Sequence, residues 1–326
     1  MTAKGLLTTT VGSFPKPDYL VHARNQFSAG KLDAEELHAL ERKATEEVIR
    51  LQEDIGLDIL VDGEMARGDM VAYFAEQLEG MEIGGLVRSY GNRYYHKPVI
   101  KGKLRWTRPM TVEMWRFAQQ LTDRPVKGML TGPYTMVEWS FIEGYDTRRD
   151  AVLAMAEAIH REARALDDAG AQYIQIDEPA LSTRLEDLDL AIEAMGIVTD
   201  GLQAHTITHV CYGDFAAVYP RFFDMPVRQF DLEMANSGYD LVDLFRRGIP
   251  NEKEIAWGVI DVHSHLIESE DDVVRGIKLG LEVLPPERLY IDPDCGLKTR
   301  TPEETEQKLR VMMKAVHRVR RELGLE

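Results

Sequence analysis

Short apolar runs of the β-strand type alternate with amphipathic helical patterns along almost the whole chain, and this alternation restricts the possible folds most. It favours βα units that build a parallel sheet. Eight runs are predicted to be strands: Leu7–Phe14, Leu57–Gly63, Val126–Leu130, Tyr173–Ile176, Ala204–Cys211, Val227–Leu232, Ile255–Val262 and Leu289–Ile291.

The segments between these runs carry apolar residues at spacings of three and four, which is the helical period. The clearest is Lys31–Ile55, where Asp33 is the predicted N-cap of an acidic first turn. Ala151–Asp168 and Asp271–Leu284 have the same character. The last helix begins at Thr301 with a capping-box pattern and a proline at its first helical position.

Eight strands with helices between them, in a chain of 326 residues, predict an α/β fold of the single (β/α)₈ TIM-barrel type. The alternative is a doubly wound open sheet, which is disfavoured because no GxGxxG or P-loop follows any strand. The segment Tyr90–Trp106 breaks the rhythm, and its Gly91-Asn92 turn signal predicts an inserted β-hairpin. We therefore expect one catalytic domain over residues 1–326.

Net charge and cysteine content restrict the partners and the compartment. The formal net charge is −16, so nucleic acid and anionic membranes would repel the chain. No apolar run is long enough to cross a bilayer, and the first residues lack the apolar core of a signal peptide. We expect a cytoplasmic protein, in which the two cysteines are buried thiols, metal ligands or nucleophiles.

Polar groups follow nearly every predicted strand. In a TIM barrel the carboxyl ends of the strands meet at one rim, where the active site forms. The strand ends bring these residues to that rim: Gly12-Ser13, Asp62-Gly63-Glu64, Thr131-Gly132-Pro133, Asp177-Glu178-Pro179, His209 with Cys211, Glu233, Asp261 with His263 and His265, and Asp292 with Cys295.

His209, Cys211, Glu233 and Cys295 are candidate metal ligands. His209 and Cys211 are two positions apart on an extended segment, so their side chains leave from the same face. Two thiolates, an imidazole and a carboxylate suit tetrahedral zinc. The spacing is not a compact CxxC pattern, however, and the alternative is two ordinary buried cysteines and a hydrogen-bonded histidine.

The remaining histidines and carboxylates of the rim have two interpretations each. His263 and His265 could form a metal pair, but a catalytic or structural histidine beside a solvent-facing one is favoured. Asp62, Glu64 and the Asp177-Glu178 pair could bind a cationic group. The alternative is that strand-end carboxylates cap the next helix, and we expect this for at least one residue of each pair.

Seven motifs, in order along almost the whole chain, resemble the catalytic half of the cobalamin-independent methionine synthase family. They are Thr8-Thr-Thr-Val-Gly-Ser-Phe-Pro15, Asp62-Gly-Glu-Met-Ala-Arg-Gly-Asp-Met70, Tyr90-Gly-Asn-Arg93, Lys127-Gly-Met-Leu-Thr-Gly-Pro133, Gln175-Ile-Asp-Glu-Pro-Ala-Leu181, Thr208-His-Val-Cys-Tyr212 and Asp292-Pro-Asp-Cys-Gly-Leu-Lys-Thr-Arg300.

The resemblance implies a homocysteine S-methyltransferase that forms methionine, and it assigns residues to roles. Zinc would be held by His209, Cys211, Glu233 and Cys295, and His263 would be the proton donor. Homocysteine would lie against Val11, Gly12 and Ser13, with its amino group near Glu64 and Asp177. The methyl donor would contact Arg93, Tyr94 and Trp139.

The choice of methyl donor is predicted from departures from the long members of the family. Those members carry an additional N-terminal barrel, whereas this chain resembles the short core synthases, and Tyr94 and Leu266 replace the residues usual near the pterin. These differences predict methylcobalamin or a corrinoid protein as donor, with 5-methyltetrahydrofolate as the alternative. A folate nitrogen would need an acid such as His263, and cobalt(I) would not.

Three rival functions remain at this stage. The first is methyl transfer to another thiol such as coenzyme M, although its sulfonate would suit Lys or Arg better than Glu64 and Asp177. The second is a hydrolase that uses His263 and His265, and the third is a zinc-binding barrel without turnover. In the favoured reaction a zinc-bound thiolate attacks the methyl carbon, and Glu233 is the ligand expected to yield to substrate.

Overall fold

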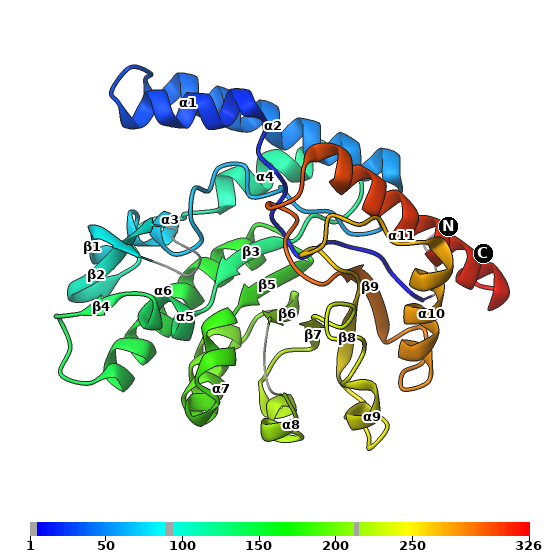
Figure 1. Ribbon diagram of the computed structural model, residues 1–326. Helices are drawn as coiled ribbons and strands as arrows, with labels where there is room; N and C mark the ends of the chain where they lie inside the picture. Colours follow the sequence, from blue (N-terminus) through cyan, green and yellow to red (C-terminus); the bar gives the residue numbers. More distant parts are fainter. Residues whose placement is uncertain (1–4, 89–93, 212–214) are drawn as a thin grey trace. The chain divides into compact units, whose positions relative to one another are not determined.

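The computed structural model describes residues 5–88, 94–211 and 215–326 (Figure 1). The chain divides into two compact units, each made of separate segments. Unit 1 consists of Met1–Ala66, Met114–Lys127 and Gln229–Glu326, and unit 2 consists of Arg67–Glu113 and Gly128–Arg228. Helix α4 (Val112–Gln120) contains the position at which unit 2 gives way to unit 1.

Unit 1 contains three parallel strands that extend into a longer ladder. Its elements are α1 (Asp18–Ser28), α2 (Ala34–Ile55), β7 (Gln229–Leu232), α9 (Val242–Phe245), β8 (Glu254–Ile260), α10 (Glu270–Leu281), β9 (Leu289–Pro293) and α11 (Pro302–Glu322). β7 pairs with β8, and β8 with β9. Ile291 of β9 then pairs in parallel with Thr8, and Leu60 with Val126.

Helices α2 and α11 of unit 1 begin where the sequence predicts. Asp33 and Glu36 form a complete capping box before α2, and Gly56 ends that helix in the left-handed conformation with φ 97°. Thr301 and Glu304 form the second capping box before α11. The two helices pack against each other, α2 in blue and α11 in red (Figure 1).

Unit 2 holds a second set of parallel strands and an antiparallel hairpin. Its elements are α3 (Ala72–Ala75), β1 (Glu79–Arg88), β2 (Tyr94–Arg105), β3 (Gly128–Thr131), α5 (Pro133–Glu138), β4 (Phe141–Ile142), α6 (Arg148–Asp168), β5 (Tyr173–Asp177), η2 (Pro179–Thr183), η3 (Leu185–Asp187), α7 (Leu188–Thr199), β6 (His205–Val210), α8 (Phe215–Val218) and η4 (Arg221–Asp224). β3 pairs in parallel with β5, and β5 with β6.

All eight predicted strand segments take part in parallel pairing within one unit or the other. The first two are shorter than predicted, because only Thr8 and Leu60 form bridges. At Thr8 the Asp58 carboxylate accepts the backbone N–H at 2.8 Å and so takes the place of a ladder partner. A strand pattern in the sequence therefore does not ensure a long hydrogen-bonded strand.

The predicted hairpin near residues 90–106 is present but begins earlier. β1 and β2 pair antiparallel from Glu79↔Arg105 to Arg88↔Tyr94, with two register irregularities, and β4 adds a short parallel edge to β2. The predicted Gly91-Asn92 turn lies outside the described residues. Among the described residues, none of the helices is both long enough and apolar enough to span a lipid bilayer.

Candidate active site

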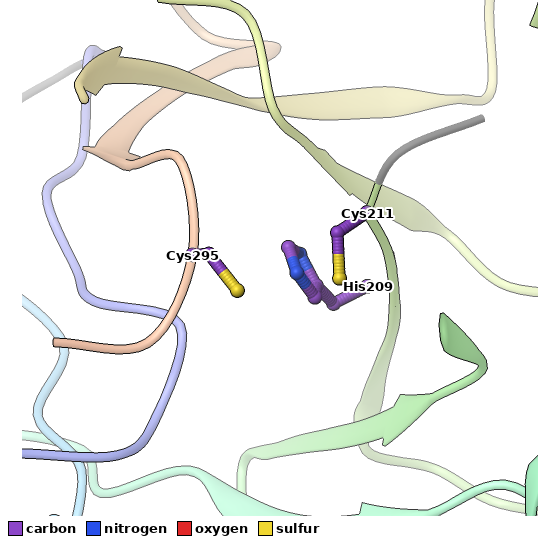
Figure 2. A group of neighbouring side chains, drawn as sticks. All are labelled: His209, Cys211 and Cys295. Atoms are coloured by element: carbon purple, nitrogen blue, oxygen red, sulfur yellow. The ribbon is translucent and has the colours of Figure 1, made fainter. Parts of the chain in front are cut away.

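Three of the four predicted metal ligands lie next to one another. His209 is in β6, Cys211 follows that strand, and Cys295 lies two residues beyond β9. One ligand atom from each of the three lies within 4.8 Å of the other two, and Figure 2 shows the side chains turned toward one another. His209 is 3% exposed and Cys211 9% exposed. Two free thiols and an imidazole in this arrangement suit a zinc ion.

Glu233, the fourth predicted ligand, follows β7 and makes a close contact with His263. The Glu233 Oε1 atom is 2.9 Å from His263 Nε2, and the side chains are 6% and 35% exposed. The backbone of His263 is fixed as well, because its N–H donates to Asp261 Oδ1 at 2.8 Å. A predicted ligand and the predicted proton donor are thus already paired.

Asp294, which sequence reasoning did not single out, ties the segment after Glu233 to the segment that carries Cys295. Its Oδ1 accepts the N–H groups of Met234 and Ala235, both at 2.9 Å, and its Oδ2 accepts that of Asn236 at 2.6 Å. Burial raises the pKa of Asp294 to about 7, with a smaller contribution from the charge of Glu233, although the three N–H donors act against this rise.

Residue 258 must be glycine for Asp294 to occupy this place. A Cβ atom on Gly258 would lie 2.2 Å from Asp294 Oδ1 and 2.8 Å from its Cα. The only sequence signals for this arrangement were an acidic residue directly before Cys295 and a glycine inside a buried strand.

The segment predicted to contact homocysteine packs against the residues that follow Cys295. Val11 and Ser13 are 4% and 8% exposed, and Gly12 is buried. The Leu297 N–H donates to the Ser13 carbonyl at 2.7 Å, and a Cβ atom on Gly296 would lie 2.1 Å from Ser13 Oγ. Val11, Gly12 and Ser13 are thus brought beside a candidate metal ligand.

Glu64 has a strained backbone with φ 55°, which is uncommon outside glycine. Two contacts hold it: Asp62 Oδ1 accepts the Glu64 N–H at 2.8 Å, and Lys16 Nζ donates to the Glu64 carbonyl at 2.9 Å. Burial lowers the pKa of Lys16 to about 8, and the charge of Glu64 acts in the opposite direction. Asp62 therefore closes a turn and does not cap the next helix, α3, whose N-cap is Val71, and the Glu64 carboxylate is not used in these two contacts.

In unit 2, the neighbouring carboxylates of Asp177 and Glu178 also differ in their contacts. Asp177 ends β5, is 8% exposed and accepts Gln175 Nε2 at 2.8 Å. Glu178 is fully buried, and it accepts the N–H groups of Tyr134 at 3.0 Å and Thr135 at 2.7 Å. Burial raises the pKa of Glu178 to about 7. Glu178 is therefore a structural residue at the start of α5.

The predicted donor residues are only partly described. Trp139 lies at the end of α5, is half-buried, and donates its backbone N–H to the Thr135 carbonyl at 3.0 Å. Tyr94 is the first residue of β2, and Arg93 lies outside the described residues. His265 is 73% exposed and contacts Glu304 at 2.8 Å, which agrees with the solvent-facing interpretation of that histidine.

Comparison with known proteins assigns the class first. Residues 6–318 match the family described as "Cobalamin-independent synthase, Catalytic domain". The fold is that of a B12-independent methionine synthase from Shewanella sp. W3-18-1, with a TM-score of 0.89, 27% identity, and coverage of 99% of this chain and 100% of that one. The protein is therefore a methyltransferase with the predicted (β/α)₈ fold, and the chain belongs to the cobalamin-independent synthase family.

Two curated relatives are similar over nearly all of this chain. A methionine synthase from Sulfolobus acidocaldarius is 38% identical over 98% of this chain and 93% of its own length. A 5-methyltetrahydropteroyltriglutamate–homocysteine methyltransferase from Mycolicibacterium paratuberculosis is 41% identical over 97% of this chain, but only 43% of that longer protein is covered. The predicted enzyme class, homocysteine S-methyltransferase, is confirmed.

The prediction of methylcobalamin or a corrinoid protein as methyl donor is wrong. The family is cobalamin-independent, and the Shewanella protein, which this chain covers completely, is described as B12-independent. Single-barrel length therefore does not require a cobalt donor. The departures at Tyr94 and Leu266, from which a cobalt donor was predicted, therefore do not indicate a different class of methyl donor.

Proposed function

We propose that this protein transfers a methyl group from 5-methyltetrahydropteroyltriglutamate to the thiol of homocysteine and releases methionine. The observation that carries the proposal is the group of two thiols and one imidazole formed by His209, Cys211 and Cys295. The donor is proposed by analogy with the Mycolicibacterium relative, a 5-methyltetrahydropteroyltriglutamate–homocysteine methyltransferase. Because the family match covers residues 6–318, we assign both units to one catalytic domain, residues 1–326. A cytoplasmic location stays a prediction.

We assign zinc to His209, Cys211, Cys295 and Glu233. The donor set supports this choice, since sulfur and imidazole ligands favour zinc over magnesium or calcium. A bound zinc ion would favour the thiolate form of homocysteine, whose thiol would otherwise have a pKa near ~8.5. Glu233 would be the ligand most readily displaced by substrate, because an oxygen donor suits zinc less well than sulfur does.

Homocysteine binds with its amino group toward the Glu64 and Asp177 carboxylates. Support comes from the charge of the two carboxylates, which suits an ammonium group, and from the family motifs Asp62–Met70 and Gln175–Leu181 in which they lie. Val11, Gly12 and Ser13 form the wall along the substrate chain. This wall excludes water and orients the sulfur for attack, which converts a bimolecular step into one between aligned groups.

His263 supplies a proton to the donor. The homocysteine sulfur attacks the methyl carbon, the bond from that carbon to the pterin nitrogen breaks, and the nitrogen receives the proton held by the imidazole. Glu233 Oε1, at 2.9 Å from His263 Nε2, orients the ring for this transfer. Arg93, Tyr94 and Trp139 are proposed to bind the pterin.

The deciding assay measures methionine formed by the purified, zinc-loaded protein. The triglutamate form of 5-methyltetrahydrofolate is offered to one sample and methylcobalamin to another. We expect methionine only with the folate donor. No methionine from the folate donor would refute the proposed reaction.

Metal analysis of matched variants tests the ligand assignment. We expect Cys295→Ser and His209→Gln to lose most of the bound zinc and most of the turnover. His265→Gln changes the exposed histidine of the neighbouring loop and is expected to retain its zinc. Equal zinc content in all three variants would show that the ligand assignment is wrong.

A further inference from the structure

The segment Asp261–Glu268, called here the His263 loop, is closed by contacts between its two ends. Glu268 Oε1 accepts the N–H of Asp261 at 3.0 Å. Asp261 in turn accepts the N–H of His263 through its own carboxylate at 2.8 Å. The backbone on the N-terminal side of His263 is therefore held by two carboxylates of the loop itself.

One buried ammonium group from α11 holds this loop at both ends. Lys308 is fully buried, and its Nζ donates to the carbonyl of Asp261 at 3.0 Å and to that of Leu266 at 2.6 Å. The same Nζ lies 2.9 and 3.0 Å from the two carboxylate oxygens of Glu268. Every one of these contacts lies within unit 1.

The His263 loop also borders a cavity, so packing alone does not fix its position. A cavity of about 270 Å³ is lined by Asp261 and Glu268 together with Asp272, Arg275 and other residues of unit 1. Removing a charge pair from water costs energy that a well-packed apolar pair would not cost, so a buried pair is weak evidence for a role in stability. The contacts of Lys308 suit a role in the position of the loop better.

We propose that Lys308 is a positioning residue for methyl transfer. It does not touch the substrate. It holds the His263 loop so that His263 Nε2 stays beside Glu233 and faces the leaving group. The inference rests on the proposed function, because it takes His263 to be the proton donor.

The first test replaces Lys308 by methionine, which keeps an unbranched chain and removes the ammonium. Misplacement of a catalytic group by about 1 Å can cost about 100-fold in rate, so we expect kcat to fall about 10- to 100-fold. The KM for homocysteine and the zinc content should stay within about twofold, since neither depends on the loop in this proposal.

Arg320→Met is the matched control. Arg320 lies on the same helix, is 3% exposed, donates to the Leu6 carbonyl at 2.9 Å and pairs with Asp58, far from the His263 loop in the chain. Both substitutions remove a buried cation from α11. If the two variants lose kcat equally at equal loss of thermal stability, Lys308 is only structural and the proposal is refuted.

A double-mutant cycle with His263→Asn separates the inference from the proposed function. If Lys308 acts through His263, Lys308→Met should lower kcat by less than about twofold in the His263→Asn background. A full additional loss would refute the positioning role while the proposed reaction stands. An undiminished kcat in His263→Asn itself would refute the proton-donor assignment instead.

A second variant keeps the test available if Lys308→Met does not fold. Lys308→Met combined with Glu268→Gln removes both charges, so the partly buried Glu268 carboxylate is not left without its cation. The same fall in kcat with an unchanged KM is expected from this pair. An unchanged kcat in the folded double variant would refute the proposal.

Discussion

Glu178 in unit 2 and Asp294 in unit 1 are two buried carboxylates built in the same way. Each comes directly after a parallel strand, Glu178 after β5 and Asp294 after β9. Each accepts backbone N–H groups from another segment of its own unit. Each lies against a glycine, Gly132 or Gly258, whose added Cβ would come within 2.2 Å of it. Burial raises the pKa of both to about 7.

The two carboxylates differ in their donors and in what those donors are connected to. Asp294 accepts three backbone N–H groups, beginning with the residue after Glu233. Glu178 accepts two backbone N–H groups and the hydroxyl of Thr135. The same device therefore orders a candidate metal ligand in unit 1 and the first turn of a short helix in unit 2.

Replacing Asp294 and Glu178 separately by alanine should give the largest difference between the two carboxylates. Asp294→Ala leaves three backbone N–H groups without their acceptor, and we expect a loss of about 3–5 kcal/mol of folding free energy. Zinc content and turnover should fall as well, because the segment that carries Glu233 is released. Denaturant unfolding and metal analysis measure these two effects.

Glu178→Ala is the comparison variant for that experiment. We expect a similar loss of about 2–4 kcal/mol from its unsatisfied donors, with bound zinc retained. If both variants lose zinc to the same extent, or neither does, the functional contrast between the two carboxylates does not exist.

Alanine substitutions at Gly258 and Gly132 should lower the stability of the protein by different amounts. An added Cβ on Gly258 meets the Cα of Asp294 at 2.8 Å and the Leu232 carbonyl at 3.0 Å, which are backbone atoms. The three closest atoms to an added Cβ on Gly132 all belong to the Glu178 side chain, which can move. We expect Gly258→Ala to cost about 3 kcal/mol and Gly132→Ala about 1–2 kcal/mol. The reverse order in thermal unfolding would contradict this account.

The pH dependence of stability should reveal the raised pKa of Glu178. The folded protein binds this proton more tightly than the unfolded chain does, so the contribution of Glu178 is fully present below about pH 4.5 and is lost as the pH rises through about 7. Glu178→Gln should remove a slope of up to about 1.4 kcal/mol per pH unit across that window. Identical slopes in wild type and variant would show that the carboxyl is ionised throughout.

Thr135→Val should have the smallest effect of these substitutions. It tests the side-chain hydroxyl that donates to Glu178, a kind of donor that differs from the backbone N–H groups at Asp294. Its hydroxyl donates to Glu178 at 2.6 Å and accepts the Ala180 N–H at 3.2 Å. We expect a loss of about 1 kcal/mol, typical of one or two hydrogen bonds, with zinc content unchanged. The three N–H contacts of Asp294 all come from the backbone, so Thr135→Val has no counterpart among them.

Local signals in the sequence predicted the regular elements well. The capping boxes at Asp33 and Thr301 act within four residues of the helices they begin, so the helix starts were readable. Strand β1 was missed because Gly80, Gly84 and Gly85 interrupt its alternation. Close approach of the partner explains two of these glycines, since a Cβ on Gly84 would lie 2.3 Å from the Lys97 carbonyl and one on Gly80 2.5 Å from that of Lys103.

The candidate site was predictable where residue chemistry is distinctive and less so where burial decides the role. His209, Cys211 and Cys295 stand out by type at strand ends, and the structure brings them together. Asp294 and Lys308 did not stand out, because charged residues are common and only their burial shows that they hold loops in place. The prediction that one carboxylate of each acidic pair caps the next helix was wrong in its detail, because Asp62 closes a turn and Glu178 accepts N–H groups of the earlier helix α5.

The contact between Arg320 and Leu6 also has a consequence for the order of events during synthesis. The two residues are 314 positions apart, and Thr8 pairs with Ile291 of β9. The segment around Thr8 therefore leaves the ribosome long before its partners in β9 and α11 exist, whereas every residue of unit 2 has been made by Arg228. Since long-range pairing is slow and domains fold as their residues emerge, we expect unit 2 to fold before unit 1, whose first segment must await β9 and α11.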